Sequence, residues 1–268
     1  MDEYRQANQA LWDEWTEIHE KSAYYDLESF MGGKSSLKAL DIAEVGAVEG
    51  KTLLHLQCHF GMDTLSWARL GAKATGMDFS EKAIALARRL NTELGLDAEF
   101  VCSDVYELPD NLAGEFDIVY TSEGVLAWLR DLPRWGEVIA HFLKPGGTFY
   151  IREIHPFGQI FDDQIETPEL NVSYPYFGTG EAHKWQTQGT YADWNAEVAQ
   201  PFNYQWTHSL SEVVNALLDA GLQLEFLHEF SFSSYQMLAF MEQRADGWWY
   251  LPEGLTEMPF TFTIKARK

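Results

Sequence analysis

Two carboxylates stand at the ends of two successive apolar runs in the first half of the chain. Asp78 follows residues 72–77, and Asp104 follows residues 98–103. Such runs are typical of buried parallel strands, whose carboxyl ends meet at one edge of a sheet. At that edge Asp78 can accept both hydrogen bonds of a ribose diol, and Asp104 can accept the exocyclic amine of adenine. Asp104 can alternatively cap a short helix over residues 105–108. The spacing predicts a nucleoside site.

The turn before the first helix of this unit limits which nucleoside fits. A short strand over residues 53–56 leads into a turn in which Gln57 and His59 stand where a G-x-G-x-x-G loop would have its first two glycines. Asp63 begins the following helix, and its charge opposes a pyrophosphate at the helix N-terminus. Gly61 is explained by close approach of a ligand to the backbone. The turn therefore disfavours a dinucleotide and favours a nucleoside that lacks phosphates and carries a cation.

Residues 51–80 resemble motifs I and II of the class I S-adenosylmethionine-dependent methyltransferases, with motif I at residues 54–61, LHLQCHFG, followed by DTLSWARLGA at residues 63–72. Motif I usually reads L-D-x-G-x-G-x-G, and this chain keeps only its last glycine. The form LQCHFG is similar to a bacterial branch whose substrates are poorly defined. The LKPGG stretch that ends at Gly147 is a further resemblance, and we expect it to form a turn before the fifth strand at residues 148–153. The resemblance implies S-adenosylmethionine as the cofactor, with Asp78 on the ribose and Asp104 on the adenine amine. The other implied cofactor-binding residues are Tyr25, Gln57, Cys58, His59, Gly61, Phe79, Ser80, Val105 and Ser122.

Three of these implied roles come from particular positions. Phe79 and Val105 would lie against adenine, residues 57–61 would line the methionine end, and Ser122 would face the cofactor amine or the acceptor. Ser80 is also a good N-cap for the next helix. Tyr25 lies upstream of motif I, where it would close over the cofactor or else only pack the N-terminal helix on the core.

Two residues are candidates for a catalytic role near the methyl acceptor. Glu123 follows the fourth strand, and His155 leaves the fifth strand near the expected methyl group, where it could deprotonate an acceptor. His155 could equally be a structural residue bonded to a loop carbonyl. The loop at residues 122–124 lacks an Asn-Pro-Pro-Tyr type of sequence, which weighs against DNA adenine or glutamine as acceptors.

The predicted fold is α/β, a Rossmann-like three-layer sandwich. We expect a seven-stranded mixed sheet in the order 3-2-1-4-5-7-6, with strand 7 antiparallel. Residues 1–268 would form one domain, with a helical arm over residues 1–50 and an aromatic-rich insert over residues 157–208 after strand 5. This insert reads as antiparallel hairpins with loops, and Tyr174, Trp185 and Tyr191 are expected to line an acceptor pocket.

The amino-acid composition disfavours several classes of binding partner. The formal net charge is −22, and such a surface repels nucleic acid and anionic lipids. We see no transmembrane run and no signal-peptide core, so we expect a cytoplasmic protein. Cys58 and Cys102 fall on strands that are not neighbours, which predicts neither a disulfide nor a metal site. The oligomeric state stays open.

The sequence thus favours an enzyme that transfers a methyl group directly to a small organic molecule. Such a displacement needs mainly alignment and desolvation, so a general base is optional. Two alternatives remain at this point. One is a protein that binds adenosylmethionine without turnover, and the other is a nicotinamide-dependent oxidoreductase.

Overall fold

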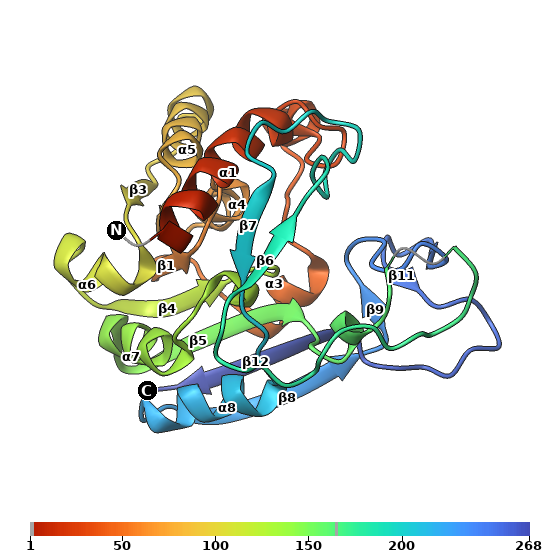
Figure 1. The fold of residues 1–268 in the computed structure, drawn as a ribbon. Helices are drawn as coiled ribbons and strands as arrows, with labels where there is room; N and C mark the ends of the chain where they lie inside the picture. Colours follow the sequence, from red (N-terminus) through yellow and green to blue (C-terminus); the bar gives the residue numbers. More distant parts are fainter. Residues whose placement is uncertain (1–2, 164–165) are drawn as a thin grey trace.

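A seven-stranded sheet forms the centre of the protein, in the order β3-β2-β1-β4-β5-β12-β8 (Figure 1). The computed structural model describes residues 3–163 and 166–268. β12 runs antiparallel to both of its neighbours, and the other pairs are parallel. The predicted order is confirmed, since the predicted strands 6 and 7 are β8 and β12. The strands are β1 Thr52–Leu56, β2 Lys73–Asp78, β3 Glu99–Cys102, β4 Phe116–Thr121, β5 Leu143–Ile154, β8 Gln223–Phe230 and β12 Thr261–Arg267.

Helices cover both faces of this sheet. On one face α7 and α8 bury residues such as Trp135 and Leu217 against β1, β4, β5 and β12. On the other face α3, α4 and α5 bury residues such as Trp67 and Ile84. The three-layer prediction is therefore confirmed. The helices are α1 Glu3–His19, α2 Leu27–Met31, α3 Ala39–Val45, α4 Met62–Arg69, α5 Glu81–Leu94, α6 Leu108–Asn111, α7 Leu132–Phe142 and α8 Leu210–Asp219, with short 3-10 turns η1 Val105–Glu107, η2 Leu126–Trp128 and η3 Gly158–Ile160.

Local sequence explains where several elements begin. Ser80 caps α5 as predicted, by accepting a hydrogen bond from the Ala83 N–H, and Ser209 forms a capping box with Glu212 at α8. The LKPGG stretch differs from the prediction, because it lies within β5 and not in a separate turn before it. Its Gly146 and Gly147 exchange backbone hydrogen bonds with Lys268, which continues the antiparallel pairing of β5 with β12 beyond Arg267.

The chain between β5 and α8 folds partly outside the main sheet. β6 (His183–Gln186) and β7 (Phe202–Gln205) pair as an antiparallel hairpin, and Figure 1 shows β7 beside α1. The Asn8 side chain joins them, since it donates to the Tyr204 carbonyl and accepts from the Tyr204 N–H, both at 2.8 Å. A second small sheet contains β9 (Phe232–Ser233), β10 (Glu242–Gln243) and β11 (Trp249–Tyr250). Two positions of the predicted insert, 164–165, lie outside the described residues, as does Asp2 of the predicted first helix.

Both cysteines are free. Cys58 follows β1 and Cys102 ends β3, and β2 separates these strands as predicted. Within the described residues no helix is long and apolar enough to cross a membrane.

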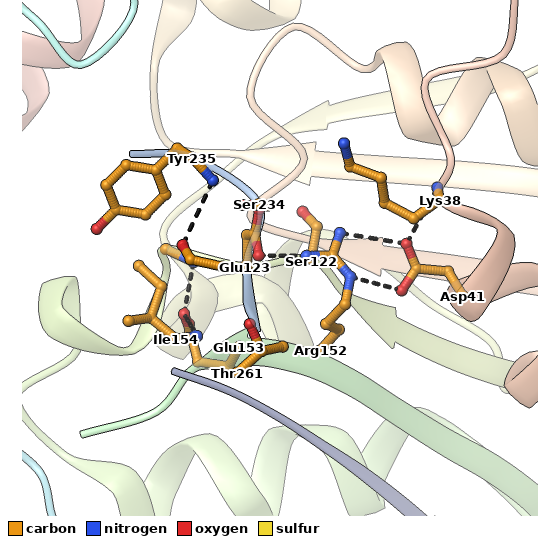
Figure 2. Close-up of polar contacts among 12 residues, drawn as sticks. Lys38, Asp41, Ser122, Glu123, Arg152, Glu153, Ile154, Ser234, Tyr235 and Thr261 are labelled. Carbon is orange, nitrogen blue, oxygen red and sulfur yellow. Dashed lines mark hydrogen bonds and ion pairs between the residues drawn. The ribbon is translucent and has the colours of Figure 1, made fainter. Parts of the chain in front are cut away.

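A buried ion-pair network joins α3 to the sheet. Arg152 on β5 is 4% exposed and donates from Nε to Asp41 at 2.8 Å and from Nη2 at 3.2 Å. On its other side Arg152 pairs with Glu123, which also accepts a hydrogen bond from the Ser234 hydroxyl. Figure 2 shows Arg152 between these groups. Since Asp41 is fully buried, each charge depends on the others for its solvation.

Loss of Asp41 should therefore destabilise the protein strongly. Asp41→Ala leaves a buried guanidinium short of a partner, and we expect the free energy of unfolding to fall by about 3 kcal/mol. Chemical denaturation checks this, with the exposed Asp97→Ala as a control that should change stability by less than about 0.5 kcal/mol. Combined with Arg152→Met, the loss should be smaller than the sum of the single losses. A fully additive double variant would contradict the coupling.

Candidate functional site

The Asp78 carboxylate lies at the carboxyl end of β2 and organises the neighbouring turn. Its Oδ2 accepts the backbone N–H of His59 at 2.8 Å, and its Oδ1 accepts the N–H of Ser80 at 2.9 Å. Asp78 is 6% exposed, and this burial raises its pKa to about 6, although the backbone donors oppose the rise. An ionised carboxylate has about four acceptor positions. The geometry thus leaves lone pairs of Asp78 available for further donors.

The turn between β1 and α4 keeps an unusual backbone at alternate positions. The φ angles are +56° at Gln57, +50° at His59 and +78° at Gly61. These positions correspond to the three glycines of the usual motif I. A left-handed conformation costs a non-glycine residue about 1–2 kcal/mol, so contacts such as the Asp78–His59 hydrogen bond must hold it. The backbone geometry that glycines permit is retained, while two side chains are added.

Packing accounts for the one glycine that remains. A Cβ on Gly61 would lie 2.6 Å from the ring of Phe100, so a side chain there would collide with β3. Gly61 is also the N-cap residue of α4. We had explained Gly61 by the approach of a ligand, and the structure gives an internal reason as well. Cys58 is buried, and its Sγ would lie 2.9 Å from a Cβ on Gly76. Its side chain therefore faces β2, and its thiol donates to the His59 carbonyl within the turn at 3.4 Å.

Helix α1 covers the edge of the sheet where the nucleoside is expected. The Gln9 side chain donates to the Phe79 carbonyl at 2.8 Å. The Ser80 hydroxyl donates to Asp13 at 2.6 Å. Farther along, Arg5 pairs with Asp104 at 3.2 Å. Phe79, Ser80 and Asp104, at the ends of β2 and β3, thus all contact this one helix.

The two interpretations of Asp104 are not exclusive. Its Oδ1 accepts the Tyr106 N–H at 2.8 Å, which caps η1, while its Oδ2 faces Arg5. Val105 begins η1 and is buried. The cap is therefore present, and the contact of Asp104 with an adenine amine stays a prediction.

The arm, the motif I turn and the aromatic segment meet in one cluster of rings. The hydroxyl groups of Tyr25 and Tyr191 are hydrogen-bonded to each other. Nδ1 of His19 on α1 lies 2.9 Å from Nε2 of His59 in the turn. Trp12 packs edge-on against His59, with ring centroids 5.1 Å apart. Tyr25 thus lies over the turn, in the position from which it could cover a cofactor.

The candidate residues beyond β4 and β5 form hydrogen bonds or ion pairs with other side chains and backbone groups of the protein. Ser122 lies 3.1 Å from Nε2 of His55, and Glu123 belongs to the Arg152 network. His155 accepts the Phe157 N–H at Nδ1 and faces Glu229 through Nε2 at 2.8 Å. Because both nitrogens have partners, His155 offers no free base in this arrangement. This matches the structural alternative more closely than the catalytic one, although the partner is a carboxylate and not a loop carbonyl.

Only one of the three aromatic residues expected to line an acceptor pocket reaches the cluster. Tyr191 packs against His19 at 4.7 Å between ring centroids. Tyr174 and Trp185 instead pair with each other at 5.5 Å, and Trp185 is 38% exposed.

Several buried polar atoms around the turn lack a partner within the described part of the chain. They include Oε1 of Gln57, Nδ1 of His59, Nε2 of His19 and the indole nitrogens of Trp12 and Trp15. Such atoms are costly unless a ligand or water satisfies them. The Gln57 amide oxygen can accept an ammonium group, and Asp78 can accept a ribose hydroxyl. The residues present therefore fit an adenosine joined to an amino acid.

Sequence reasoning missed the residues that α1 contributes, above all His19, Gln9 and Asp13. The amphipathic pattern of the helix predicted that it packs on the core, with Trp12 and Trp15 on its inner face. Nothing in that pattern indicates which part of the core it covers.

The raised pKa of Asp78 predicts a pH-dependent stability. Because the native state binds this proton more tightly than the unfolded chain, whose ordinary pKa is near 3.8, the contribution of Asp78 to stability should fall as pH rises from about 4 to 7. The buried neutral histidines His19 and His55, whose pKa burial lowers to about 3, act in the opposite direction. For Asp78 alone the fall is about 2 kcal/mol. Urea unfolding of wild type and Asp78→Asn at both pH values checks this, and wild type should lose stability relative to Asp78→Asn between pH 4 and pH 7. Parallel pH profiles would contradict it.

Comparisons with known proteins agree with this geometry. Residues 53–147 match the family model described as a methyltransferase domain. A ubiquinone biosynthesis O-methyltransferase from Caulobacter vibrioides is 36% identical over 107 residues, which cover 40% of this chain and 42% of that protein. One from Nitrosococcus oceani is 31% identical over 142 residues, covering 52% and 58%. The matches thus span only about half the length of these relatives.

Solved structures resemble a larger part of the chain. An S-adenosylmethionine-dependent methyltransferase from Mesorhizobium loti has a TM-score of 0.61 and 23% identity, covering 89% of this chain and 100% of that one. A glycopeptide N-methyltransferase in complex with S-adenosylmethionine has a TM-score of 0.54 and 16% identity, covering 86% and 87%. The likeness to these structures shows that the chain has the fold of S-adenosylmethionine-dependent methyltransferases, and a methyltransferase domain model matches residues 53–147 of it.

Proposed function

We propose that this protein transfers a methyl group from S-adenosylmethionine to a hydroxyl oxygen of a small organic molecule. The observation that carries this proposal is Asp78 at the end of β2, hydrogen-bonded to a turn that is left-handed at residues 57, 59 and 61. This combination supports a nucleoside held without phosphates.

The cofactor supplies an activated methyl group on a positively charged sulfur. Asp78 would accept the ribose hydroxyls, and Phe79 and Val105 would border the adenine. The Gln57 amide oxygen, buried and without a partner among the described residues, would accept the ammonium of the methionine end. Tyr25 and Tyr191 would exclude water from the reacting atoms, which favours a displacement that depends on alignment.

The choice of oxygen as the methylated atom rests on the relatives. Those from Caulobacter vibrioides and Nitrosococcus oceani are described as O-methyltransferases. The choice of a small molecule rests on this chain: a formal charge of −22 disfavours nucleic acid, and aromatic rings crowd the turn, where a compact apolar group would fit. The roles of Glu123 and His155 in acting on the acceptor are not part of this proposal, because protein groups engage both side chains.

Cofactor binding gives the direct test. By isothermal titration calorimetry the protein should bind S-adenosylhomocysteine and not NAD, because the turn at residues 57–61 lacks the glycine-rich sequence that holds a pyrophosphate. Asp78→Asn keeps one acceptor oxygen but loses the negative charge. Because a charged acceptor makes stronger hydrogen bonds than a neutral one, we expect the affinity for S-adenosylhomocysteine to fall by at least about tenfold.

The exposed Asp97→Asn is the matched control and should bind as wild type does. Tight NAD binding, or equal S-adenosylhomocysteine affinity in Asp78→Asn, would overturn the assignment of this edge as the cofactor site. Binding without methylation of any acceptor would indicate a protein that binds adenosylmethionine without turnover.

A further inference from the structure

His19 and His59 form a hydrogen-bonded pair whose outer nitrogens are both unpaired. Nδ1 of His19 lies 2.9 Å from Nε2 of His59. Nε2 of His19 and Nδ1 of His59 are buried and have no partner within the described residues. The pair bridges α1 and the motif I turn, across 40 positions of sequence. The usual motif I has a glycine at the position of His59, and His19 lies outside the motif. The motif therefore does not explain the pair.

The tautomers of such a pair are coupled. Each neutral imidazole has one N–H donor and one acceptor nitrogen. If His59 donates at the shared hydrogen bond, its outer Nδ1 is an acceptor and the outer Nε2 of His19 is a donor; the reverse holds if His19 donates. One end of the pair can therefore always accept a proton while the other end can release one.

The surroundings of the pair keep it neutral. His19 is fully buried, and this burial lowers its pKa to about 3. Burial also lowers the pKa of His59, and His19 adds to that effect. The rings of Trp12, Trp15, Tyr25 and Tyr191 enclose the two imidazoles, with centroid separations from 4.7 to 6.2 Å.

The same enclosure indicates what would bind beside the pair. Aromatic rings associate edge to face with a planar ring. The indole nitrogens of Trp12 and Trp15 are donors only, and both are buried without a partner in the described chain. They suit an oxygen acceptor, while the accepting nitrogen of the histidine pair suits an O–H. The rings contact one another, so a ligand must separate α1 and Tyr191 from the turn as it enters.

We propose that His19 and His59 form a proton relay for methyl transfer to a phenolic hydroxyl bound within this aromatic cluster. This inference rests on the proposed function, and it adds the class of acceptor and the route of the proton. His59 is the catalytic residue, because it lies in the turn beside the expected methyl group, and His19 is its partner in the relay.

A lone pair of the phenolic oxygen forms the bond to the methyl carbon, while the carbon–sulfur bond breaks and its electron pair stays on sulfur. The phenolic proton passes to Nδ1 of His59. The shared proton moves from Nε2 of His59 to Nδ1 of His19, and His19 releases its Nε2 proton to solvent when the cluster opens. The products are an aryl methyl ether, a thioether and one proton.

A weak base is sufficient for this step. As the oxygen gains the methyl group it becomes positively charged, and its proton becomes strongly acidic. A neutral imidazole with a low pKa can then accept the proton, and it does not compete as a cation with the sulfonium. A positioned base of this kind contributes about 10²–10⁴-fold to the rate.

The test combines binding, turnover and chemical rescue. Wild type, His19→Gln, His59→Gly and the exposed control His141→Gln are titrated with S-adenosylhomocysteine and then assayed with phenol, catechol and 4-hydroxybenzoate as acceptors, with methyl ethers detected by mass spectrometry. Glycine suits the φ of +50° at position 59 and leaves space for added imidazole.

We expect His19→Gln and His59→Gly to lower kcat by about 100-fold or more, with S-adenosylhomocysteine affinity within about threefold of wild type. Imidazole should restore part of the rate in His59→Gly, and His141→Gln should behave as wild type. If wild type binds S-adenosylhomocysteine but methylates none of the phenols, the acceptor class is wrong. If the two variants keep their rate, or imidazole does not restore it, the relay is wrong. Failure of wild type to bind S-adenosylhomocysteine would instead refute the proposed function.

Discussion

The hydrogen bond from the His59 N–H to the Asp78 carboxylate is the interaction on which the site depends. It joins the end of β2 to the turn after β1, and it holds a non-glycine residue at a φ of +50°. Without it, the left-handed backbone at Gln57 and His59 would relax, because each such residue costs about 1–2 kcal/mol. The same carboxylate accepts the Ser80 N–H, which aligns the start of α5. One buried charge thus fixes both segments that border the proposed nucleoside.

The altered motif I changes side chains more than backbone. Three glycines would leave the turn bare, whereas Gln57 and His59 project an amide and an imidazole from the same backbone geometry. These groups are buried with polar atoms that lack partners among the described residues, and α1 supplies His19 and two tryptophans above them. In this chain, the N-terminal arm therefore completes the site together with the turn. This explains why Tyr25, Tyr191 and His59 converge from segments far apart in the sequence.

Much of the fold could be predicted because its signals are local. The apolar runs located β1, β2 and β3 to within a residue or two, and Ser80 marked the start of α5 through its cap. Asp78 could be placed at the sheet edge because a carboxylate ended a buried run. The LKPGG stretch was misplaced, since its pairing with Lys268 is a contact between distant residues. Contacts between distant residues also account for three features that the sequence did not predict. These are the His19–His59 pair, the pairing of His155 with Glu229, and the packing of α1 over the sheet edge.

A crystal structure of the complex with S-adenosylhomocysteine tests the central claim most directly. The account predicts both ribose hydroxyls within about 2.6–3.2 Å of the Asp78 carboxylate, with the His59 N–H still bonded to it and the thioether sulfur beside residues 57–61. A nucleoside bound elsewhere, or one that leaves Asp78 bonded only to backbone N–H groups, would contradict it.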